Sequence, residues 1–180
     1  LNESFKIDEE FAEKKEGTIT LSVQNALNTM ITKSDNYSAL LLAANVRLTN
    51  VQKFLNDHGL TESKVGTSSL PPTITAYDGA LFLNKLYNGE FANVENTQSM
   101  LTLLKGQVLN SKLPKLLPKN TVIGHKTGEL GGYSHDGGIV FTEAGDYIIV
   151  VLTKTTSPKD ANDRIAQISK GVYDYFGDLG

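Results

Sequence analysis

The sequence predicts an α+β fold in which an antiparallel sheet is flanked by helices. Up to about residue 118, apolar side chains recur at the 3–4 spacing of helices, and from about residue 119 β-branched residues form extended segments. A helical part, a three-strand meander and a final helix that can cover the sheet make a layered α+β architecture. We expect a single domain over residues 1–180, with the helical part at about 18–118 and the meander and terminal helix at about 119–180.

Three helices are expected in the first third of the chain. The first begins at Thr20, whose hydroxyl suits an N-cap, and Gly59 ends the third. An apolar segment at 39–44 predicts a second helix that is buried on most sides. Thr49 or Asn50 caps the third helix. The apolar face of the first helix consists of Val23, Ala26, Leu27, Met30 and Ile31.

The middle of the chain predicts a loop followed by two more helices. Residues 60–74 contain the glycines, prolines and serines of a loop. Thr75 and Asp78 form a capping box for a helix that Gly89 ends. A further helix is expected at 95–105, because its apolar residues again follow helical spacing.

The last third predicts three strands and a closing helix. Residues 121–123 lead into the first strand, and 137–141 and 147–153 form the other two. Ser157 and Pro158 are an N-cap and a first-turn proline for the last helix. The apolar face of that helix is expected to hold Ile165, Ile168, Val172, Tyr175 and Phe176.

The composition excludes several classes of function. The net charge of −3 argues against a nucleic-acid binder, because no basic excess exists to neutralise phosphates. The chain has no cysteine, which excludes disulfides, thiolate metal ligands and a cysteine nucleophile. No run reaches the roughly 18 apolar residues of a membrane-spanning helix. We expect no metal and no cofactor.

Two short motifs carry the chemistry that the sequence suggests. The first is Ser-Asp-Asn at 34–36, and the second is Lys-Thr-Gly at 126–128. Each alone is typical of a helix end or a turn. In this order and with these flanks, they resemble two of the three motifs of the class A β-lactamase-related serine hydrolases. These enzymes belong to the penicillin-recognising superfamily of β-lactamases and D,D-peptidases.

The flanks of the motifs extend the resemblance over nearly the whole chain. The segment 17–36 resembles the helix before the first motif in that family, and 73–90 resembles its threonine-rich loop and following helix. The segment 125–140 resembles the family pattern HKTGEL…HDGGIV. The resemblance implies a β-lactamase/transpeptidase-like fold.

The resemblance also implies roles for three catalytic residues. The residue that matches Ser34 relays a proton to the leaving nitrogen. The residue that matches Asn36 hydrogen-bonds the substrate's amide. Lys126 matches a strand lysine that raises the local positive potential. This superfamily uses lysine and serine in place of the histidine of other serine hydrolases.

Four further residues are expected to bind the substrate. Thr127 matches the hydroxyl that holds the substrate's carboxylate. Gly128 lets the substrate backbone lie against the strand as an added strand would. The backbone N–H of Glu129 matches the second oxyanion-hole donor. His135, with Asp136, is expected to line the cleft beside the strand lysine.

Two departures from the family pattern limit these expectations. The family's Ser-x-x-Lys, which carries the nucleophile, occurs nowhere in the 180 residues. We therefore expect the chain to lack the N-terminal strands and nucleophile helix, and to be inactive and poorly stable by itself. The stretch 61–73 is short and lacks the Glu-x-x-Leu-Asn of efficient class A β-lactamases, which favours a D,D-peptidase-like or weakly hydrolytic enzyme.

The sequence leaves two readings of function open. The first is a serine hydrolase that acts on β-lactams or D-Ala-D-Ala-type peptides of peptidoglycan through an acyl-enzyme. The second is a non-catalytic cell-wall-binding module with a degenerate cleft. Either is expected to be a bacterial monomer located outside the cell or in its envelope.

Two other arrangements are weaker. Residues 134–136 have the composition of a Ser-His-Asp triad, but consecutive strand residues point to opposite faces and a triad must converge. His125, His135 and Asp136 could hold a metal only if their strands pair suitably.

Overall fold

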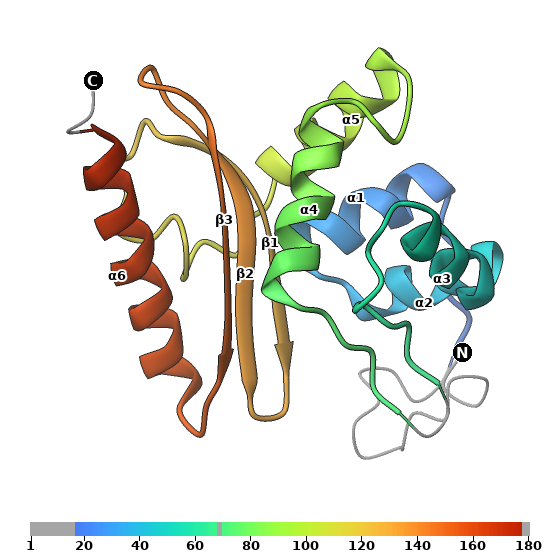
Figure 1. Ribbon diagram of the computed structural model, residues 1–180. Coiled ribbons are helices and arrows are strands. Elements are labelled where there is room, and N and C mark those ends of the chain that lie inside the picture. Colours follow the sequence, from blue (N-terminus) through green and yellow to red (C-terminus); the bar gives the residue numbers. More distant parts are fainter. Residues whose placement is uncertain (1–16, 68–69, 178–180) are drawn as a thin grey trace. The chain divides into compact units, whose positions relative to one another are not determined.

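The structure is a computed structural model that describes residues 17–67 and 70–177 (Figure 1). The chain forms two compact units, Leu1–Ile74 and Thr75–Gly180. The structure has both the helices and the antiparallel sheet of the expected α+β class, with all three strands in the second unit. The prediction of a single domain stays a prediction.

The first unit contains α1 (Val23–Lys33), α2 (Asn36–Val46) and α3 (Leu48–Asp57). The Ser22 hydroxyl caps α1 by accepting from the N–H of Asn25 at 3.2 Å. The expected cap at Thr20 is therefore wrong, although the residues that form the helix were predicted. Two hydroxyl residues lie close together there, and Ser22 is the one directly before the first turn.

The start of α3 also differs from the prediction. The helix begins at Leu48, before both expected caps, and it follows Arg47, whose φ is 65°. The Asn50 side chain donates to the carbonyl of Val46 at 2.9 Å instead of capping the helix. The apolar part of α2 at 39–43 is half-buried, so the expectation that it is buried on most sides is wrong.

The second unit contains α4 (Ala76–Tyr87), α5 (Val94–Lys105), β1 (Val122–Leu130), β2 (Tyr133–Phe141), β3 (Tyr147–Lys154) and α6 (Pro158–Gly177). The Thr75 hydroxyl caps α4 by accepting from the N–H of Asp78 at 3.1 Å, which confirms the predicted start. The strands form one antiparallel sheet in the order β1-β2-β3. β2 begins earlier than predicted, at Tyr133.

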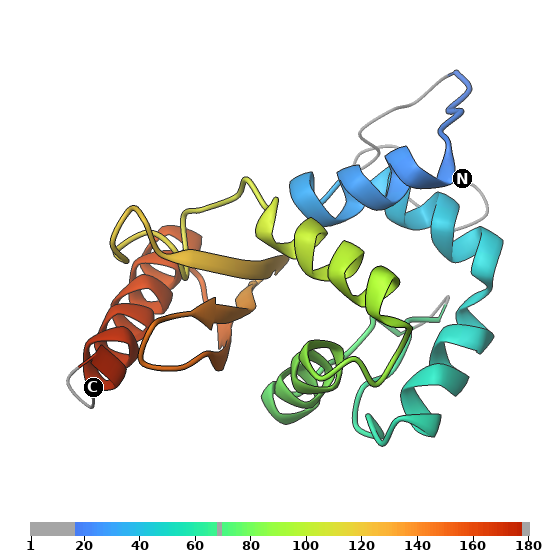
Figure 2. The ribbon, with the colours of Figure 1, turned by 90° about the horizontal axis from the view of Figure 1, so that it is seen from above.

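The second unit is layered, with α6 on one face of the sheet and α4 and α5 on the other (Figures 1 and 2). The layer between α6 and the sheet is the apolar core, which includes part of the loop between α5 and β1. Burying this surface is the main term that holds the unit together. The core consists of Leu113, Leu117, Val140, Tyr147, Ile149 and Ile165.

The buried face of α6 differs in part from the predicted one. Ile165 is fully buried, and Val172 and Phe176 pack against the core as expected. Ile168 and Tyr175 are instead exposed, at 47% and 63%. Three small residues of α6 are buried together with Ile165. These residues are Ala161, Ala166 and Ser169.

The strand register places the Lys-Thr-Gly motif of β1 directly beside residues of β2. Thr127 pairs with Asp136, and Gly128 pairs with His135. Among the described residues β1 pairs only with β2, so β1 is an edge strand. An edge strand offers unpaired backbone groups along its free side.

Two glycines of the sheet are expected to respond differently to substitution. A Cβ at Gly138 would lie 2.7 Å from the Cβ of His125 and 2.9 Å from the carbonyl oxygen of Gly124. Gly138→Ala should therefore destabilise the full-length protein by about 1–3 kcal/mol in urea unfolding. Gly128→Ala is the control, because a Cβ there meets nothing closer than 3.6 Å and should change stability little. Equal losses would contradict this packing.

No helix within the described residues combines the length and the apolar character that crossing a membrane requires.

Candidate active site

The Ser-Asp-Asn motif forms the junction between α1 and α2. Ser34 ends α1 in the left-handed conformation, with φ 56° and ψ 37°, and its N–H donates to the carbonyl of Thr29. Asp35 caps α2, because its Oδ1 accepts from the N–H of Ser38 at 2.7 Å. The hydroxyls of Ser38 and Thr29 lie 2.7 Å apart and join the two helices. The junction is thus fixed by hydrogen bonds on both sides of Ser34.

The conformation of Ser34 is uncommon. Among the described residues, the non-glycine residues with positive φ are Ser34 and Arg47. A non-glycine residue in this region costs on the order of 1–3 kcal/mol, and such strain gathers at functional sites. The role of Asp35 is explained by its capping of α2. The strained backbone of Ser34 is not explained by capping, which is consistent with a functional role for this serine.

The Lys-Thr-Gly motif lies on the edge strand β1. Lys126 is half-buried, and its Nζ donates to the carbonyl of Thr127 at 2.7 Å. Burial lowers the pKa of Lys126 below its usual 10.5, the nearby charge of Lys112 acts in the same direction, and Asp136 opposes both. Thr127 is 8% exposed. The motif therefore offers a cation in partly desolvated surroundings, where its electrostatic effect is strong.

Gly128 has no packing reason to be glycine. Its φ is not in the left-handed region, and an added Cβ would find only ordinary contacts with the His135 side chain, at 3.6 and 3.9 Å. Gly138, by contrast, is required by its neighbours. A glycine that the protein's own packing does not require is consistent with close approach of another chain along β1.

A buried polar network lies behind the motif, on the side of the sheet that faces the loop between α5 and β1. The Nδ1 atom of His125 is 3.0 Å from Oδ1 of Asp136, and its Nε2 atom is 3.1 Å from Oδ1 of Asn110. Oδ2 of Asp136 accepts from the N–H of Leu113 at 3.1 Å. Both His125 and Asp136 are 1% exposed. The expectation that Asp136 lines a cleft is therefore wrong, because its carboxylate supports the strand from within.

Glu129 and the β2 residue His135 share a buried partner. The ammonium of Lys112, which is 1% exposed, lies 2.7 Å from Oε1 of Glu129 and donates to the carbonyl of His135 at 3.2 Å. The sequence did not single out Lys112. It is one of several lysines in an irregular loop, and the contacts that bury it come from residues far along the chain.

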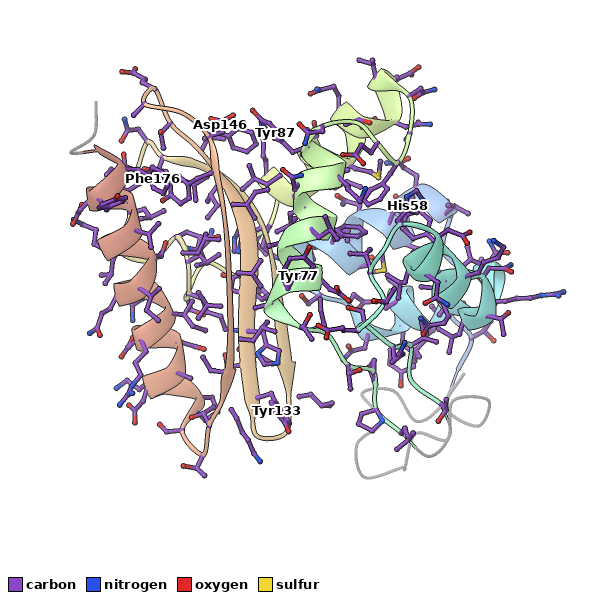
Figure 3. All side chains as sticks on the ribbon, in the orientation of Figure 1. His58, Tyr77, Tyr87, Tyr133, Asp146 and Phe176 are labelled. Carbon is purple, nitrogen blue, oxygen red and sulfur yellow. The ribbon has the colours of Figure 1, made fainter. Side chains whose placement is uncertain are left out.

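His135 lies near the end of the sheet where β1 joins β2. Its Nδ1 atom accepts from the N–H of Thr153 at 3.0 Å, and its ring is 5.8 Å from that of Tyr133. Figure 3 shows Tyr133 at this end of the sheet and Asp146 at the opposite end, beside Tyr87. Tyr87 donates to Asp146 at 2.8 Å, and this hydrogen bond raises the pKa of the tyrosine.

The triad composition at 134–136 does not form a triad. Ser134 donates to the side chain of Asn162 at 2.7 Å, whereas Asp136 contacts His125. The middle residue, His135, bonds to Thr153. Three or more metal-ligating side chains do not gather anywhere in the described parts of the chain.

The structure thus gives the candidate site as two halves. The first half holds Ser34 and Asn36 at the junction of α1 and α2. The second half holds the predicted residues of β1 at 126–129, with His135 paired opposite Gly128. The halves belong to different units of the chain, and each is described by itself. The roles of these residues stay predictions.

Comparison with known proteins decides the family. A model of the beta-lactamase enzyme family matches residues 1–176. The chain belongs to this family. Beta-lactamase VEB-1 of Pseudomonas aeruginosa is 26% identical to the chain, over 87% of the chain and 60% of VEB-1. The chain therefore spans about 60% of the length of that relative.

Solved structures of beta-lactamases and penicillin-binding proteins share the fold. The beta-lactamase of Sphaerobacter thermophilus matches with a TM-score of 0.84 and 24% identity, over 91% of this chain and 66% of that one. PBP-A matches with a TM-score of 0.84 and 23% identity, over 91% of this chain and 64% of PBP-A. The expected β-lactamase/transpeptidase-like fold is confirmed, and the chain covers only part of it.

Proposed function

We propose that the full-length protein is a serine acyl-transfer enzyme that acts on β-lactams or D-Ala-D-Ala-type peptides. The observation that carries the proposal is the edge strand β1, on which a half-buried lysine precedes Thr127 and the glycine that packing does not require. An extended peptide can add to such an edge as a further strand. A mutant of PBP-A, 21% identical with a TM-score of 0.83, has been solved as an acyl-enzyme complex with penicillin G, and this supports the same chemistry here.

The residues of this chain take the following parts in the proposed reaction. Ser34 passes a proton to the leaving nitrogen, and Asn36 holds the amide of the substrate. Lys126 raises the local positive potential, Thr127 holds the carboxylate, and the N–H of Glu129 stabilises the oxyanion. The nucleophile is a Ser-x-x-Lys serine outside residues 1–180, because that motif does not occur within them. Residues 1–180 alone are accordingly expected to be inactive.

The short loop after α3 is an argument for slow hydrolysis of the acyl-enzyme. The backbones of Lys64 and Thr73 pair with each other at 3.0 Å in both directions and close a short loop. Glu62 is the carboxylate in the stretch 61–73, and the Glu-x-x-Leu-Asn pattern is absent from it. Without a base that activates water, the acyl-enzyme with a β-lactam persists.

A non-catalytic module that binds peptidoglycan is the second candidate, and it is favoured by the absence of Ser-x-x-Lys from the 180 residues. A Ser-x-x-Lys elsewhere in the full-length protein would reject it. For either function we propose a monomer outside the cytoplasmic membrane, since peptidoglycan lies there.

The test is labelling of the full-length protein with a fluorescent penicillin across a range of pH. Protonated Lys126 supplies the positive potential, which is lost as pH rises through its pKa. Because burial lowers that pKa, the alkaline decline in acylation should fall below pH 10.5. In Lys126→Arg the guanidinium stays charged, so the decline should move to higher pH. No labelling would reject the enzyme, and an unmoved decline would reject this role of Lys126.

A further inference from the structure

Lys112 is a fully buried lysine that the proposed reaction does not use. Lysine is almost never fully buried unless it is paired, because removing an ammonium from water is costly. Here its Nζ atom is 2.7 Å from Oε1 of Glu129 and 3.2 Å from the carbonyl oxygen of His135. Glu129 directly follows Gly128, and His135 pairs with Gly128 across the strands. One ammonium thus joins β1 and β2 at the glycine of the motif.

The residues around Lys112 anchor the same segment to both strands. The N–H of Leu113 donates to Asp136 on β2 at 3.1 Å. The side chain of Asn110 lies 3.1 Å from Nε2 of His125 on β1. We call residues 110–113 the clamp. The clamp contacts β1 through Asn110, β2 through Leu113 and both strands through Lys112, so it resists sliding or splaying of β1 against β2.

The link to Lys112 restrains the side chain of Glu129, whose backbone pairs with Ser134 across the strands. The Glu129 side chain is 60% exposed, and an exposed glutamate usually samples several rotamers. Pairing with a buried ammonium fixes one end of the side chain. Because side-chain rotamers depend on φ and ψ, a fixed side chain also narrows the backbone conformations of its own residue.

We propose that Lys112 is a positioning residue, which fixes the backbone of Glu129 and with it the N–H assigned to the oxyanion hole. The inference rests on the proposed function. An oxyanion donor must be in place before charge develops, and a shift of about 1 Å in a reacting group costs about 100-fold in rate. The clamp supplies that placement from behind the strand, without contact with the substrate.

The test uses Glu129→Gln in the full-length protein, because this variant removes the charge pair and keeps the buried lysine and the backbone. The maximal rate of acylation by penicillin G should fall about 10- to 100-fold, and the apparent Kd should not change. Lys112→Arg, which keeps the charge, should retain more activity than Lys112→Met. The matched controls are Lys115→Met and Asp163→Asn. Each breaks an exposed pair, 2.5 Å long, between the same loop and α6, and each should leave acylation unchanged.

A second readout does not depend on the reaction. Backbone order parameters from ¹⁵N relaxation at 128–130 should fall from about 0.85 toward 0.6 in Glu129→Gln, and they should stay high in Asp163→Asn. Unchanged order parameters at 128–130 or an unchanged acylation rate in Glu129→Gln would overturn the proposal. If the unaltered protein is not acylated, the proposed function fails and the order parameters alone decide whether Lys112 positions Glu129.

Discussion

Replacing Ser34 by alanine in the full-length protein is expected to slow acylation by penicillin G about 100- to 10,000-fold. The expected loss is that of a positioned proton-transfer group, because the variant keeps the backbone and removes only the hydroxyl. Stopped-flow measurement of acylation with a chromogenic β-lactam checks the rate.

The variant Ser34→Gly distinguishes the effect of losing the hydroxyl from the effect of the strained backbone at this position. Glycine adopts a φ of 56° without steric cost, so this variant should be at least as stable as the unaltered protein. It lacks the hydroxyl and should be as slow as the alanine variant. Normal acylation by Ser34→Gly would show that the serine at this position ends a helix and does no more.

Replacing Asp136 by alanine is expected to cost about 3–5 kcal/mol of stability. The change leaves His125 and the N–H of Leu113 without the carboxylate that both contact, in surroundings from which water is excluded. That is a large part of the 5–15 kcal/mol by which a typical domain is stable. Urea unfolding of the full-length protein measures the loss.

Asp174→Ala is the matched control for this loss. Asp174 pairs with Lys170 at 2.6 Å on the surface of α6, with side chains 51% and 43% exposed. A surface pair of this spacing contributes about 0.3–0.5 kcal/mol. Equal losses for Asp136→Ala and Asp174→Ala would mean that the buried network does not hold β1 and the clamp in place.

Local signals explain why some elements were predictable. Thr75 and Asp78 lie within one helical turn, so the cap of α4 is complete in a few residues of sequence. The same reasoning failed at α3, because Arg47 adopts a positive φ that no residue preference favours. Helical spacing also gave a wrong prediction on α6: it places Ile168 on the buried face, whereas this side chain is exposed.

The candidate site shows the same division between local and distant contacts. The residues of the two motifs could be named, because a resemblance to a family rests on short stretches of sequence. Lys112 and Asn110 could not, since their partners lie 23 and 15 residues away and depend on the sheet register. The face of Asp136 was also missed, because strand alternation gives two faces without saying which one is buried.

The most direct test of the account is intact-mass spectrometry of the full-length protein after incubation with penicillin G, followed by peptide mapping. The account predicts one long-lived covalent adduct on a serine outside residues 1–180, formed more slowly in Ser34→Ala and Lys126→Ala. Absence of an adduct with the penicillin left intact, or an adduct on Ser34 itself, would contradict it.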